Sequence, residues 1–150
     1  MGGQETLLLV ARYPQLLAGA VAVDALVDFA RQYRNWNDSP GAAKRKLARR
    51  EVGGTPATAA DAYAARSPLD YARAIASSGV PLQIWWTRTD RVVTDSPMHS
   101  GLLATRIRQL NPGAPLTEVV GAWRHTAAMR ADSSLPTMLV GLGLLPQSDV

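Results

Sequence analysis

The chain has 150 residues, of which 47% are hydrophobic and 19% are charged, a composition typical of one globular domain. Its longest apolar runs, TLLLVA and AGAVAV, are much shorter than the roughly 20 residues that span a bilayer, so we expect no membrane anchor. Because the chain contains no cysteine, disulfides, thiol nucleophiles and thiolate metal sites are excluded.

The formal net charge is +4, and many basic residues lie in one stretch. The segment KRKLARRE contains Lys44, Arg45, Lys46, Arg49 and Arg50, and Arg34 is close by. A run of this kind is typical of the solvated face of a surface helix. The more specific and less common alternative is contact with nucleic acid. We expect a solvated helix and no nucleic-acid partner; the alternative predicts salt-sensitive retention on DNA or RNA.

The chain is expected to begin with a helix followed by a strand. Residues 4–12 are apolar on nearly all sides, and YPQ ends this helix because Pro14 disfavours helical backbone at Tyr13. The run over 18–23 is rich in Val and Ala and has the length and flanks of a strand buried on both faces. A helix that leads into such a strand is the beginning of an α/β layer.

Residues 29–78 are expected to form a helical, cap-like insertion. Within it, a basic helix runs from about Pro40 to Arg50 and ends at the two glycines that follow. Two pairs have the spacing of a capping box, in which side chains satisfy the free amides of a first turn: Thr58 with Asp61, and Ser67 with Asp70.

The second half alternates strands and helices. The segment GVPLQIWWTRTD contains the clearest strand, which ends in the polar residues 87–90. A helix begins near Pro97, with Asp95 as its expected cap, and ends at NPG. A third strand is expected over 116–120 and a closing helix over 134–142.

The order of these elements implies parallel strands joined by crossover helices. We find no internal repeat, low-complexity tract or linker that would divide the chain. We therefore expect residues 1–150 to form a single α/β domain with about three parallel strands.

Two chemically active side chains follow strands of this sheet. Asp90 closes the loop after LQIWWTRT, and His125 lies five residues after the strand LTEVV. Functional groups in open parallel sheets gather beyond the carboxyl ends of the strands. Asp90 could therefore orient the ring of His125 while its other ring nitrogen takes a proton from a nucleophile.

A resemblance to a known family rests on three segments. They are MGGQETLLLVARYP, then REVGGTP with YAARSPLDYARAIASSGVPLQIWWTRTDRVV, and finally VVGAWRHTAAM. In this order they resemble the α/β-hydrolase segment directly after the nucleophile elbow, the approach to the catalytic acid, and the histidine loop of the branch similar to prolyl oligopeptidase-like serine hydrolases. The resemblance covers nearly the whole chain. It implies a partial α/β-hydrolase fold with Asp90 as catalytic acid and His125 as general base.

In this family the nucleophilic serine lies in a G-x-S-x-G elbow. The resemblance aligns Met1 with the position after that serine and Gly2 with the final glycine, so the serine would directly precede Met1. The backbone nitrogen of Met1 would then belong to the oxyanion hole. No serine in the chain has the glycine two positions earlier that an elbow needs, so the chain alone is expected to be inactive.

The resemblance implies a hydrolase that cleaves a small-molecule ester or a peptide through an acyl-serine intermediate, without a cofactor. Peptidase and esterase remain equally open. A metal cluster is not expected, since His99 and His125 are the only histidines. The alternative is a noncatalytic binding module, a truncated hydrolase fold that pairs its open sheet edge with a partner.

Several other residues have two possible roles. Asp24, at the end of the first strand, is either the alternative catalytic acid or a helix or loop cap, and His99 is expected to face solvent. Gly2 and Gly3 are either flexible or allow a close approach of helix and strand. Three aromatic residues either line a substrate pocket or pack in the interior: Tyr33, Trp36 and Trp123.

Overall fold

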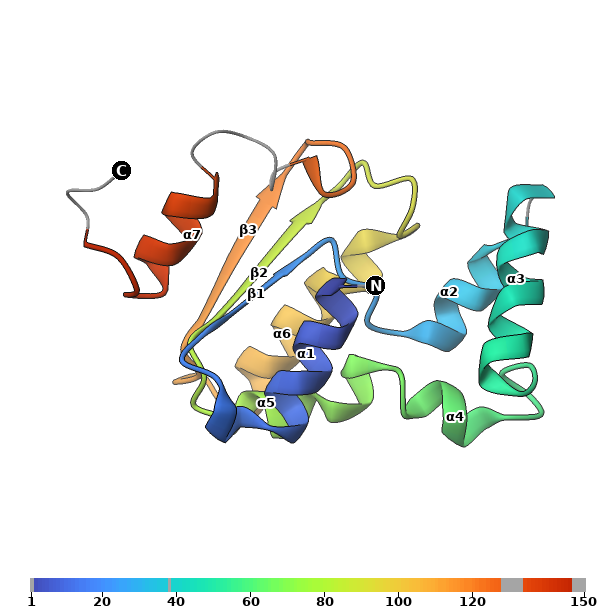
Figure 1. Cartoon of the computed structure of the whole chain (residues 1–150), viewed down its shortest axis with the longest axis horizontal. Helices are drawn as coiled ribbons and strands as arrows, with labels where there is room; N and C mark the ends of the chain where they lie inside the picture. Colours follow the sequence, from blue (N-terminus) through green and yellow to red (C-terminus); the bar gives the residue numbers. More distant parts are fainter. Residues whose placement is uncertain (1, 38, 128–133, 147–150) are drawn as a thin grey trace.

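A parallel sheet of three strands forms the centre of the computed structural model, which describes residues 2–37, 39–127 and 134–146 (Figure 1). The strands are β1 (Ala20–Val23), β2 (Leu82–Thr87) and β3 (Leu116–Gly121), in that spatial order. In the register of the sheet, Leu82 is paired with Ala20 on one side and with Leu116 on the other. The expectation of a mixed α/β fold with three parallel strands is confirmed.

Helices account for most of the remaining described residues. The α-helices are α1 (Gly2–Arg12), α2 (Phe29–Asn35), α3 (Ser39–Val52), α4 (Ala60–Ala64), α5 (Ala72–Ala76), α6 (Ser100–Leu110) and α7 (Ser134–Gly141). Short 3-10 helices are η1 (Pro14–Leu16), η2 (Pro68–Tyr71) and η3 (Ser96–Met98). None of the described helices has the length and apolar character needed to cross a membrane.

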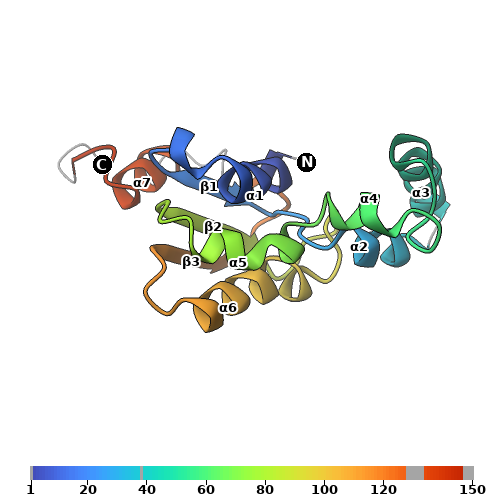
Figure 2. The same cartoon turned by 90° about the horizontal axis from the view of Figure 1, so that it is seen from below.

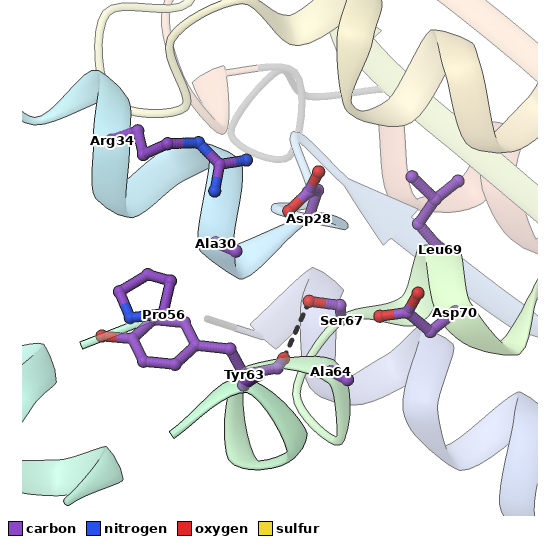
Figure 3. Close-up of a pocket in the computed structure, with 10 residues that line it drawn as sticks. Asp28, Ala30, Arg34, Pro56, Tyr63, Ala64, Ser67, Leu69 and Asp70 are labelled. Carbon is purple, nitrogen blue, oxygen red and sulfur yellow. Dashed lines mark hydrogen bonds between the residues drawn. The ribbon is translucent and has the colours of Figure 1, made fainter. Parts of the chain in front are cut away.

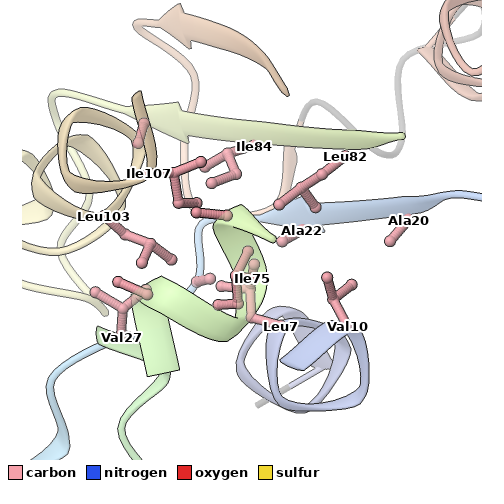
Figure 4. Packing of buried hydrophobic residues seen from close by; sticks show 14 of the residues in the cluster. Leu7, Val10, Ala20, Ala22, Val27, Ile75, Leu82, Ile84, Leu103 and Ile107 are labelled. Carbon is pink, nitrogen blue, oxygen red and sulfur yellow. The ribbon is translucent and has the colours of Figure 1, made fainter. Parts of the chain in front are cut away.

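The main hydrophobic core lies between one face of the sheet and the helices α1, α5 and α6 (Figure 4). Side chains alternate along a strand, so Leu82, Ile84 and Trp86 of β2 all point to this face. Their partners include Leu7, Val10, Ala22, Ile75, Leu103 and Ile107, each at most 3% exposed. This packing explains why α1 and α6 carry their apolar residues at helical spacing.

The opposite face of the sheet carries α7, on the other side of the strands from α1 and α6 (Figure 1). Gln83, which points away from the main core, is 3% exposed and donates a hydrogen bond from Nε2 to the carbonyl of Met138 at 2.9 Å. Its Oε1 accepts a hydrogen bond from Trp85 Nε1 at 2.8 Å. A buried amide therefore attaches the closing helix to the central strand.

The helices α2, α3 and α4 form a lobe beside the sheet, visible in both views (Figures 1 and 2). The lobe has its own small cluster, in which Tyr63 packs against Phe29 and Tyr33 at ring-centroid distances of 5.1 and 5.6 Å. By contrast, α5 belongs to the main core, so residues 29–78 serve two packing layers. Most basic side chains of α3 are exposed, which agrees with the expectation of a solvated helix.

The side-chain capping bonds predicted for Thr58, Ser67 and Asp95 are not made, although Ser67 and Asp95 occupy the positions directly before η2 and η3. Thr58 Oγ1 instead accepts a hydrogen bond from the Thr55 amide within a turn, and Asp95 makes an ion pair with Arg31 at 3.3 Å. Ser67 Oγ accepts from the amide of Phe29 at 3.0 Å and donates to the carbonyl of Tyr63 at 2.9 Å. The hydroxyl thus joins two helices rather than capping its own, because the folded chain brings a free amide of α2 to it.

His99 is fully buried, contrary to the expectation that it faces solvent. Its Nδ1 accepts hydrogen bonds from the amides of Val27 and Asp28 at 3.4 and 3.3 Å. Burial lowers the pKa of His99 from 6.5 to about 4, since desolvation disfavours the imidazolium and outweighs the opposing charge of nearby carboxylates such as Asp28.

We expect acid to destabilise the protein through His99. Between pH 6.5 and 4 the unfolded chain binds the proton that the folded chain excludes, so stability should fall as pH falls, by about 3 kcal/mol in total. Urea unfolding across this pH range measures the loss. His99→Asn, which keeps an acceptor for the two amides but cannot titrate, should flatten this pH dependence; an unchanged slope in the variant would contradict the assignment.

Gly3 allows α1 to approach the end of β1 closely. This agrees with the interpretation that the glycines near the start permit a close approach of helix and strand. A Cβ at Gly3 would lie 2.9 Å from the carbonyl oxygen of Val23 and 3.0 Å from the Cβ of Ala25, whereas a Cβ at Gly2 would meet nothing within 4 Å. We expect Gly3→Ala to lower the free energy of unfolding by about 1–3 kcal/mol through overpacking. The matched variant Gly2→Ala should have no effect or add up to about 1 kcal/mol by helix propensity. Denaturant unfolding of both variants tests the difference, and equal effects would refute the close-approach explanation.

Candidate functional site

The site lies at the carboxyl edge of the sheet, where the loops after β2 and β3 meet. Asp90 lies three residues after β2, and His125 four residues after β3. Parallel pairing of β2 with β3 brings the two loops to the same edge. The structure places Asp90 Oδ2 2.7 Å from His125 Nδ1, so the two residues singled out from the sequence are in direct contact.

The carboxylate of Asp90 is held by the turn that follows it. Its Oδ1 accepts hydrogen bonds from the amides of Val92 and Val93 at 2.7 and 3.0 Å. These bonds direct the other oxygen, Oδ2, at the imidazole. The side chain of Asp90 is 0% exposed while that of His125 is 27% exposed, so part of the ring reaches solvent.

Asp24 is next to this pair but has different partners. It is 4% exposed, and its Oδ1 accepts a hydrogen bond from the amide of Thr87 at 2.9 Å. Its Oδ2 accepts from Trp123 Nε1 at 3.2 Å and from the amide of Thr126 at 2.6 Å. Asp90, and not Asp24, is therefore the acid that touches His125 in this arrangement.

The three residues Asp24, Asp90 and His125 each present a ligand-type atom within 4.8 Å of the others. A metal ion would bind at about 2.0–2.2 Å from each nitrogen or oxygen. The direct 2.7 Å contact between Asp90 and His125 leaves no space for an ion between those two atoms. In addition, both oxygens of Asp24 already face N–H donors, so the group is arranged as a hydrogen-bonded cluster.

The remaining predicted site residues have separate locations. Met1, the expected oxyanion-hole residue, lies outside the described residues. Trp123 is beside the site, with its ring 6.1 Å from that of Trp85, whereas Tyr33 and Trp36 pack in the helical lobe. Tyr33 also lines a shallow hollow of about 360 Å³ in that lobe.

A second hollow, of about 270 Å³, lies between α2, α4 and η2 (Figure 3). Its lining includes the carboxylates of Asp28 and Asp70 and the guanidinium of Arg34. Partial desolvation and the neighbouring Asp28 charge both raise the pKa of Asp70. Neither Asp90 nor His125 lines this hollow, so it is separate from the acid–histidine contact.

Sequence reasoning missed the role of two threonines at the site. Thr87 donates from Oγ1 to the carbonyl of Trp123 at 2.7 Å, and the Thr126 amide reaches Asp24. The sequence pattern identifies Thr87 only as a polar residue at a strand end, because its contacts depend on a loop 36 residues away. Only the parallel pairing of β2 and β3 could have pointed to them.

Comparison with models of known protein families and with curated proteins found no match.

We expect Asp90→Asn to reverse the tautomer of neutral His125. With the wild-type carboxylate, His125 donates its Nδ1–H to Asp90; in the variant the amides of Val92 and Val93 keep the asparagine oxygen, so its NH₂ faces Nδ1, which must then accept. Long-range ¹H–¹⁵N spectra, recorded where the ring is neutral, should change from mainly Nδ1–H to mainly Nε2–H. Asp95→Asn is the matched control and should leave the spectrum unchanged. A persistent Nδ1–H form in Asp90→Asn would contradict the contact.

Proposed function

We propose that this chain carries the acid and histidine of a serine hydrolase of the α/β-hydrolase type. The observation that carries the proposal is the 2.7 Å contact between Asp90 and His125 at the carboxyl edge of a parallel sheet. The chain order of acid before histidine agrees with that family, as does the resemblance of the three segments. The substrate would be a small ester or a peptide.

In this mechanism Asp90 fixes the ring of His125 with Nδ1–H directed to the carboxylate. The opposite nitrogen, Nε2, is then an acceptor that takes the proton of a serine hydroxyl as the serine attacks the substrate carbonyl. Asp90 stabilises the imidazolium that results. His125 next donates the proton to the leaving group, and it later activates water to release the acyl group from the serine.

By the resemblance, the nucleophile would directly precede Met1, and the Met1 amide would help bind the oxyanion. The position of α1 supports this proposal, since Gly3 packs against Val23 and Ala25, the neighbours of Asp24. The start of α1 is therefore close to the end of β1. The next residue, Asp24, contacts the histidine loop, which is the loop after β3 that carries His125. Among the described residues, no serine hydroxyl is hydrogen-bonded to His125, and the proposal assigns the nucleophile to a serine outside them.

The test begins with the coding sequence upstream of Met1. If an in-frame strand followed by G-x-S is present, the extended protein should react with a fluorophosphonate probe at that serine and hydrolyse p-nitrophenyl esters or a peptide amide. His125→Gln should lower the rate by roughly 10⁶-fold because the serine loses its base, and Asp90→Asn by roughly 10⁴-fold because the ring loses the correct tautomer. Mass spectrometry of the labelled protein identifies the serine.

Asp95→Asn is the control, because this carboxylate is in the same loop but contacts Arg31. It should retain nearly full labelling. The hydrolase proposal fails if no serine of the extended protein is labelled, or if labelling persists undiminished without His125. Either result would favour the alternative of a noncatalytic binding module.

A further inference from the structure

Asp24 is a buried carboxylate that the proposed acid–base pair does not use. It is 4% exposed and lies directly after β1, where its amide donates to the carbonyl of Trp85 at 2.7 Å. Burial of an unpaired carboxylate is costly, so its hydrogen bonds indicate what the residue does. Two of these hydrogen bonds come from the histidine loop.

Two of the three side-chain bonds of Asp24 lie on either side of His125. Oδ2 accepts from Trp123 Nε1, two residues before the histidine, and from the amide of Thr126, directly after it. The Thr126 bond is short, at 2.6 Å, as expected of a bond to a charged acceptor. We propose that Asp24 is a positioning residue. It fixes the loop on both sides of His125 and so directs the imidazole ring toward Asp90. The catalytic importance of this positioning rests on the proposed function.

Backbone conformation at both ends of the Asp24–Thr126 bond supports this inference. Asp24 has φ 45° and Thr126 has φ 55°, the left-handed region that residues other than glycine rarely adopt. For the β-branched Thr126 this conformation is particularly unfavourable. A single hydrogen bond joins the two strained residues, and such strain persists only where surrounding contacts enforce it.

The position of the Trp123 indole also depends on Gly121, independently of Asp24. A Cβ at Gly121 would lie 1.8 Å from Trp123 Cζ3, so only glycine leaves space for the ring at this position. The carbonyl of Trp123 also accepts a hydrogen bond from Thr87 Oγ1 at 2.7 Å. The loop before His125 is thus held through both its side chain and its backbone.

Other roles for Asp24 fit the contacts less well. As a catalytic acid it would need an oxygen free for His125, but three N–H donors occupy its two oxygens, and Asp90 already contacts Nδ1. As a helix cap it is not needed, because Asp28 caps α2 by accepting from the amide of Arg31 at 2.8 Å. Loop positioning accounts for both contacts of Oδ2, while Oδ1 binds the end of β2 through the amide of Thr87.

The decisive variant is Asp24→Asn, studied by NMR in the chain itself. Loss of the charge weakens all three bonds, and whichever way the amide is turned its NH₂ faces at least one N–H donor. We expect hydrogen exchange of the Thr126 amide to rise roughly tenfold or more, and the ring signals of His125 to change from one defined Nδ1–H tautomer to a mixture. Asp95→Asn, which removes a carboxylate paired with Arg31 and not with the loop that carries His125, is the control and should leave the His125 signals unchanged.

Unchanged His125 signals in folded Asp24→Asn would overturn the proposal, because a merely structural role would leave the tautomer intact. If that variant does not fold, Trp123→Phe decides: it removes one donor to Oδ2 and should raise Thr126 exchange and perturb His125 in the same direction, and an absence of both effects would refute positioning.

These measurements do not depend on the proposed nucleophile, so the two proposals can fail separately. If Asp24→Asn alters His125 but the extended protein is not labelled by fluorophosphonate, the hydrolase function fails and the loop contact stands. If labelling succeeds and the His125 ring signals do not change in Asp24→Asn, only the positioning role fails.

Discussion

One buried carboxylate joins the ends of two strands to the histidine loop. Asp24 follows β1, accepts from the amide of Thr87 at the end of β2, and accepts from two groups of the loop after β3. Because a buried carboxylate without partners is strongly unfavourable, these donors must be in place when the sheet is complete. Pairing of the strands and formation of the site are therefore coupled.

The two carboxylates at this edge differ through their partners rather than their chemistry. Asp90 has one oxygen fixed by the amides of Val92 and Val93, which leaves the other for His125. Asp24 has both oxygens occupied by N–H donors from other segments. The five N–H groups offset the repulsion of two neighbouring negative charges. The same functional group thus orients a ring in one case and supports a loop in the other.

The helical lobe is connected by hydrogen bonds and an ion pair to the loop after β2, which carries Asp90. Gln32 of α2 donates from Nε2 to the carbonyl of Val92 at 3.1 Å, and Arg31 is paired with Asp95. The buried His99, which follows this loop in the chain, accepts hydrogen bonds from the amides of Val27 and Asp28 directly before α2. Movement of α2 would therefore be transmitted to the turn that holds Asp90, which gives the lobe a structural connection to the candidate site.

The sequence by itself determined the α/β class, the three strands and the two side chains that meet at the sheet edge, because periodicity and strand ends are local properties of the chain. The strand expected over 18–23 was two residues too long at its start, since pairing with β2 begins only at Ala20. Tertiary structure decided which acid contacts His125, the burial of His99 and the partners of Ser67. Each of these depends on hydrogen-bond donors from segments distant in the chain, and no local pattern specifies which distant amide a buried side chain will meet.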